Sequence, residues 1–145
     1  MSRPTLPTFL RHITLATLDP EASAAFFGAT FGWQPVRGPG NARMSTRWLS
    51  MGPGQEMHLV FKEDFEVSAH EQEFGRHFAL SCPLGEFAAL KERLVAHGAE
   101  LVAPGRDTPF ERFFFRSPDG YVFEIIEAEK FKDEIDQLFE ENNES

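Results

Sequence analysis

The segment RHITLA at residues 11–16 recurs as RHFALS at residues 76–81, which is 65 residues later in a chain of 145. In both copies an Arg-His pair opens a run of alternating apolar residues, which is typical of a β-strand with one buried face. A repeat of this length indicates that the chain contains two copies of one structural unit. The duplication therefore constrains the fold more than any other feature of the sequence.

A helical stretch follows the repeated strand in each copy. The first is DPEASAAFFGATFGW (residues 19–33) and the second is PLGEFAALKERLVAHGAEL (residues 83–101). Asp19 or Ser23 could cap the first helix, and we expect Gly32 and Gly98 to end the two helices at equivalent places. The two copies therefore share a strand followed by a helix.

Three short strand-like runs follow each helix, separated by turn residues. They are GWQPV, ARMSTRWLS and EMHLVFK in the first copy, and AELVA, ERFFFR and YVFEIIEA in the second. Each half thus has the order βαβββ, and the predicted fold class is α+β. Neither half can bury its sheet alone, so we expect the two to share a core. Residues 62–75 are expected to be a mobile polar linker or a lid.

Composition narrows the class of protein. The net charge is −9, and residues 128–145 hold seven acidic residues against two lysines. This balance argues against a nucleic-acid surface, and it predicts an acidic helix or tail over residues 129–145. Cys82 is the only cysteine, so no disulfide can form within the chain. With no apolar run long enough to cross a membrane and no signal-peptide pattern, we expect a soluble cytoplasmic protein.

Residue parity places one potential metal ligand on each of four predicted strands, on the face opposite the large apolar residues. These ligands are His12, His58, His77 and Glu124. His58 follows His12 by 46 residues and Glu124 follows His77 by 47, so each copy supplies one ligand from its first strand and one from its last. Imidazoles with one carboxylate suit a divalent first-row ion, with Ni, Zn, Fe, Co and Mn all open. Satisfied polar residues on a sheet are the alternative interpretation.

The sequence resembles the vicinal oxygen chelate superfamily, which includes glyoxalase I, bleomycin-resistance proteins and extradiol dioxygenases. The strongest local signature is FFFRSPDGYVFEIIE at residues 113–127, and HITLATLDPEASAAFFGATFGW matches the opening strand and helix of the family. The resemblance covers residues 9–128. It implies one domain of two βαβββ modules, about 9–62 and 76–128, that forms a cup-shaped half-barrel around a metal.

The resemblance also implies that His12, His58, His77 and Glu124 are the metal ligands, and that a homodimer builds the cup. The chain departs from bacterial glyoxalase I at His58, where that enzyme has glutamate. The implied chemistry is a glyoxalase-like lyase or isomerase reaction on a small substrate with vicinal oxygens, through a metal-bound enediolate, with Glu124 as the catalytic base. A non-haem iron extradiol-type dioxygenase and a non-catalytic drug-binding module are the alternatives.

Overall fold

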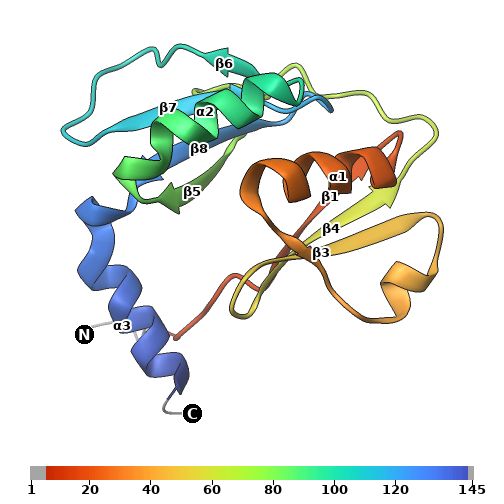
Figure 1. The fold of residues 1–145 in the computed structure, drawn as a ribbon, viewed down its shortest axis with the longest axis horizontal. Helices are drawn as coiled ribbons and strands as arrows, with labels where there is room; N and C mark the ends of the chain where they lie inside the picture. The colour runs from red at the N-terminus through yellow and green to blue at the C-terminus, as the bar shows by residue number, and fades with distance from the viewer. Residues whose placement is uncertain (1–5, 144–145) are drawn as a thin grey trace. The chain divides into compact units, whose positions relative to one another are not determined.

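The computed structural model describes residues 6–143 and divides the chain into two compact units, Met1–Phe65 and Glu66–Ser145. Each unit has one four-stranded sheet with a helix packed against it (Figure 1). The boundary falls between the two copies of the predicted repeat.

The first unit has a mixed sheet with the strand order β1-β4-β3-β2. Strand β1 pairs with β4 in parallel, and the other neighbours are antiparallel. The elements of this unit are β1 (His12–Thr17), α1 (Pro20–Phe31), β2 (Gln34–Pro35), the 3₁₀ helix η1 (Pro39–Ala42), β3 (Thr46–Gly52) and β4 (Gln55–Phe61).

Helix α1 begins and ends where the sequence predicts. The Asp19 side chain accepts a hydrogen bond from the amide of Ala22 (3.0 Å), and Pro20 occupies the first turn, where its missing amide costs nothing. Gly32 ends the helix in the left-handed conformation (φ 73°), which a residue with a side chain adopts at a cost. The helix packs on β3 and β4 and buries Phe27 against the Trp33 ring.

The second unit repeats this topology with the strand order β5-β8-β7-β6 and a parallel β5–β8 pair. Its elements are β5 (Phe78–Cys82), the 3₁₀ helix η2 (Leu84–Glu86), α2 (Phe87–Ala96), β6 (Glu100–Val102), β7 (Arg112–Arg116), β8 (Val122–Glu127), the 3₁₀ helix η3 (Ala128–Phe131) and α3 (Lys132–Asn143). The two βαβββ modules and the α+β class are therefore confirmed. The acidic C-terminal segment is helical to Asn143, and the rest of it lies outside the described residues.

The strand alternation predicted from parity holds in the core of both sheets. Met57 and Leu59 of β4 are fully buried, as are Phe123 and Ile125 of β8. Phe61, the last residue of β4, differs, because its side chain lies at the end of the sheet and is 44% exposed. Within residues 6–143, no helix is long and apolar enough to cross a membrane.

Residues 67–75 are held by contacts within the second unit and do not form a free linker. Glu71 is buried and pairs with Arg76, while Glu73 pairs with Arg112 of β7. Val67 lies against Gly120, where an added Cβ would come within 2.8 Å of a Val67 methyl group. These contacts explain why the polar composition of the segment is misleading: two of its carboxylates, those of Glu71 and Glu73, have cationic partners within the unit.

Candidate metal half-sites

The first unit brings together His12 of β1 and His58 of β4. The strand register pairs Thr14 with His58, so His12, two residues earlier, shares the face of His58. The two imidazole rings stack with centroids 4.2 Å apart and planes inclined by 16°. Trp48 of β3 stacks on His58 from the opposite neighbouring strand, at 4.3 Å and 12°. The orientation of the His58 ring is therefore fixed between two aromatic neighbours.

A carboxylate also contacts His58. Glu56 lies two residues earlier on β4, and its Oε1 is 2.9 Å from Nε2 of His58. Because a carboxylate only accepts, the imidazole nitrogen donates this hydrogen bond. A ring held through Nε2–H offers Nδ1 to a metal, which is the usual arrangement of a ligating histidine and its carboxylate partner. Glu56 is therefore the carboxylate partner of a predicted ligand and is not itself one of the four predicted ligands.

The second unit brings together His77, immediately before β5, and Glu124 of β8. The register pairs Ala79 with Glu124, so His77 stands to Glu124 as His12 stands to His58. Nε2 of His77 is 3.3 Å from Oε1 of Glu124. The Phe114 ring of β7 meets the His77 ring edge-on, with centroids 5.4 Å apart. Glu124 is 7% exposed, so this carboxylate requires partners that offset its desolvation.

The contacts of His77 show what this pair can bind. Nδ1 lies 3.3 Å from the backbone carbonyl of Gln72, an acceptor, so this nitrogen carries the proton. In the neutral ring Nε2 then presents a lone pair to an ionised Glu124 oxygen, and only a proton or another cation between them makes that contact favourable. With bonds of about 2.1 Å to one ion, the 3.3 Å separation corresponds to an angle of roughly 100° at the ion. The donor pair therefore fits a divalent metal.

The second oxygen of Glu124 is bound by Arg112 of β7. Nη1 of Arg112 donates to Oε2 of Glu124 (2.8 Å), and Nη2 donates to Oε1 of Glu73 (2.7 Å). The arginine side chain is only 4% exposed and lies over the Phe114 ring. Burial opposes its charge, but hydrogen bonds to Glu124 and Glu73 outweigh that effect and raise the pKa of Arg112. Arg112 is therefore a fixed cation.

Arg112 is not one of the four ligands predicted from the sequence. Its role follows from the register: Arg112 pairs with Ile126, two residues from Glu124, and thus shares the face of the carboxylate. The equivalent position in the first unit is Thr46, which pairs with Val60, two residues from His58. The carboxylate ligand thus has an arginine beside it, and the imidazole ligand has a threonine.

The structure thus places the four predicted ligands in two pairs, one in each unit. Within the described part of the chain, no three His, Cys, Asp or Glu side chains form a group that could hold a metal. The meeting of all four at one ion stays a prediction.

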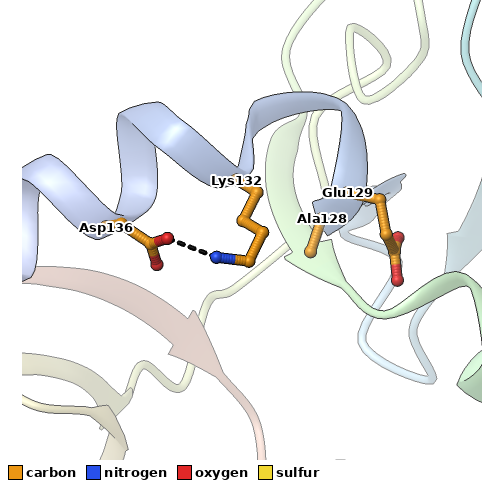
Figure 2. Close-up of a pocket in the computed structure, with 4 residues that line it drawn as sticks. All are labelled: Ala128, Glu129, Lys132 and Asp136. Carbon is orange, nitrogen blue, oxygen red and sulfur yellow. Dashed lines mark hydrogen bonds and ion pairs between the residues drawn. The ribbon is translucent and has the colours of Figure 1, made fainter.

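A separate hollow lies at the C-terminal helix and contains none of these residues. Ala128, Glu129, Lys132 and Asp136 line it, and Lys132 forms an ion pair with Asp136 (Figure 2). Both oxygens of Glu129 accept from the amide of Leu84. Three of its four residues thus have local partners, which favours a structural role.

The sequence profile of the Glyoxalase/Bleomycin resistance protein/Dioxygenase superfamily matches residues 9–125. The chain belongs to this superfamily. The resemblance and the fold predicted from the sequence are both confirmed. No protein with a curated functional description matches the chain.

Solved structures of the superfamily support the same fold. FosX, a fosfomycin resistance protein from Listeria monocytogenes, is 18% identical with a TM-score of 0.68, over 84% of this chain and 92% of FosX. A glyoxalase-related enzyme from Fulvimarina pelagi is 30% identical with a TM-score of 0.61, over 84% of this chain and 88% of the enzyme. A glutamate-to-glutamine mutant of the Listeria FosX, solved with Mn(II) and 1S,2S-dihydroxypropylphosphonic acid, is 20% identical with a TM-score of 0.65, over 83% of this chain and 90% of the mutant.

Proposed function

We propose that this protein is a metal-dependent enzyme that acts on a small substrate with vicinal oxygens, as a lyase or isomerase of glyoxalase type. The observation that supports it is the equivalent placement of one ligand pair in each module. In both sheets the second ligand lies opposite the residue two positions after the first. A His-His pair and a His-Glu pair at equivalent positions are the arrangement that a duplicated metal site would have.

We propose that His12, His58, His77 and Glu124 hold the ion. A bound divalent metal would act as a Lewis acid that polarises the substrate oxygens. Three neutral imidazoles and one carboxylate leave such a site with one net positive charge, whereas glutamate in place of His58 would leave none. The present ligand set therefore favours a substrate that develops negative charge on its oxygens.

Glu124 is the proposed base for proton transfer at the carbon next to a carbonyl group. Its Oε2 is held by Arg112, so Oε1, the oxygen that faces His77, is the one that would bind the ion and would have to leave it as substrate binds in order to accept a proton. The buried position keeps this exchange away from bulk water. Trp48, which stacks on His58, would form an apolar wall beside the substrate, whereas Phe114, which is only 1% exposed, supports His77 from the core.

The metal complex of the Listeria FosX mutant adds support for the ligand class. That protein was solved with Mn(II) and a compound that carries hydroxyl groups on neighbouring carbons. For the present chain we infer the same two requirements, a divalent ion and a pair of adjacent oxygens.

Metal content and turnover together test the proposal. We expect about one divalent ion per site in the purified protein, loss of the ion in His77→Ala, and turnover of a hemithioacetal by the wild type. His97→Ala is the matched control, because His97 ends α2 and lies outside the ligand set. Full metal occupancy in His77→Ala would contradict the ligand assignment.

A second candidate is extradiol-type oxygen insertion. It would require that His58 stay off the ion, which would leave His12, His77 and Glu124 as the three ligands. Two imidazoles and one carboxylate with open positions suit Fe(II) and dioxygen. Oxygen uptake in the presence of a catechol, without hemithioacetal turnover, would select this function.

A further inference from the structure

Residues 70–76 form a tight loop just before the second repeated strand. The amide of Arg76 donates to the carbonyl of His70 (2.7 Å), and the amide of Gly75 donates to the carbonyl of Gln72 (3.1 Å). The chain folds back so closely at Gly75 that an added Cβ would lie 2.1 Å from the His70 carbonyl oxygen. Only glycine fits this position without displacement of backbone.

The loop is anchored to the second unit at Glu71. The Glu71 side chain is fully buried, and its Oε2 accepts from Nε of Arg76 (2.6 Å). Its backbone carbonyl accepts from Nη2 of Arg116 on β7 (3.2 Å). These contacts hold the two following residues, Gln72 and Glu73, at defined places over the sheet.

Gln72 contacts one candidate ligand directly, and Glu73 contacts the other through Arg112. The Gln72 carbonyl accepts from Nδ1 of His77, which directs the lone pair to Nε2. Glu73 binds Arg112, and Arg112 binds Oε2 of Glu124, which leaves Oε1 facing His77. Glu73 is itself fixed, because its Oε2 accepts from the amide of Gly105 (2.5 Å).

We propose that the 70–76 loop is the positioning element of the His77–Glu124 half-site, with Gln72 and Glu73 as its positioning residues. Two consecutive residues select which nitrogen of one ligand and which oxygen of the other are presented to the ion. The inference rests on the proposed function, since it assigns the loop a role toward the metal. It goes beyond that function because the residues that orient His77 and Glu124 lie outside the set of metal ligands.

The test changes the loop and leaves every ligand in place. Gly75→Ala displaces the loop, and Glu73→Ala removes the partner of Arg112. We expect the dissociation constant of Mn(II), measured by calorimetry on the full chain, to rise about 10- to 100-fold in each, as is usual when partners of metal ligands are lost. Gly85→Ala and Arg106→Ala are the controls. A Cβ at Gly85 meets nothing within 4 Å, and Arg106 approaches Glu73 only at 3.9 Å. Affinities of both loop variants equal to those of their controls would overturn the proposal.

A metal-free measurement separates this inference from the proposed function. Nitrogen NMR of the His77 ring should show more of the proton on Nδ1 in the wild type, where the Gln72 carbonyl accepts it, than in Gly75→Ala, and correspondingly less on Nε2 beside Glu124. If the wild type binds no Mn(II), the proposed metal function fails, and the tautomer of His77 still decides the role of the loop. An unchanged tautomer in Gly75→Ala would overturn it. If Gly75→Ala does not fold, Glu73→Ala decides through the affinity.

Discussion

Replacement of Arg112 by methionine tests whether the fixed cation of the second unit is required by Glu124. Methionine keeps an unbranched chain over the Phe114 ring but removes the charge and both donors. Glu124 would then be a buried carboxylate without its cation. Removal of one partner from a buried ion pair destabilises proteins by about 3–5 kcal/mol. We expect the lower value, about 3 kcal/mol, because His77 remains beside Oε1.

This loss is large enough to measure without ambiguity. For a chain of this size, about 3 kcal/mol corresponds to a fall in Tm of about 9 °C. Urea unfolding of the metal-free protein gives the free energy directly. Arg116→Met is the matched control on the same strand, because Arg116 donates to the backbone carbonyls of Gly120 and Glu71 and to neither ligand. We expect it to lose only about 1 kcal/mol.

A second substitution identifies the cause of the loss. Glu124→Gln in the Arg112→Met background removes the uncompensated charge, so the double variant should be more stable than Arg112→Met alone. Equal stability of Arg112→Met and Arg116→Met, or no recovery in the double variant, would refute the argument that the arginine offsets the desolvation of Glu124.

Three further measurements test the remaining expectations. The Gly105 amide and then Arg112 lower the pKa of Glu73, so its contribution to stability is present above the ordinary carboxyl pKa and is lost as pH falls through the lowered value. The stability difference between wild type and Glu73→Gln should therefore shrink from pH 7 to about pH 3, and a constant difference would contradict this. Trp33→Phe leaves Trp48 as the only tryptophan. Because Trp48 stacks on His58, its fluorescence emission should change when Mn(II) is added and recover with a chelator. Unaltered emission would argue against metal binding at the His12–His58 pair. Sedimentation should show the homodimer predicted from the family resemblance, and a monomer would require all four ligands to meet within one chain.

The fold could be predicted from the sequence because both copies of the repeat carry the same signals for strands and helices. Each of these signals depends on residues that are close together in the chain. Asp19 and Gly32 bound α1 through contacts within a few residues, and these are contacts that a sequence displays. Parity also placed His77 and Glu124 on one sheet face, since the alternation of side chains depends only on position in the strand. Parity alone does not account for the exposure of Phe61, because burial at a strand end depends on what lies beyond the strand.

The partners of the ligands could not be predicted in the same way. Arg112 differs from other arginines only through its register against β8, and that register emerges when the strands pair. Residues 70–76 are polar, and their composition alone indicates a linker. Their role depends on the tight turn at Gly75 and on contacts from Glu73 to a residue 39 positions away. Contacts between residues far apart in the chain cannot be predicted from the pattern of a single sequence.

The two units carry different residues at equivalent positions, and this difference matters for protein engineering and for the divergence of gene duplicates. Glutamate at 124 is accompanied by arginine at 112, whereas histidine at 58 is accompanied by threonine at 46. A variant that introduces glutamate at 58 would leave that carboxylate beside a neutral neighbour, so a change at 46 to a cationic residue should be introduced with it. In each sheet the ligand position and its neighbour on the adjacent strand thus depend on each other. In proteins that evolve from this duplicated unit, we expect the two residues to change together.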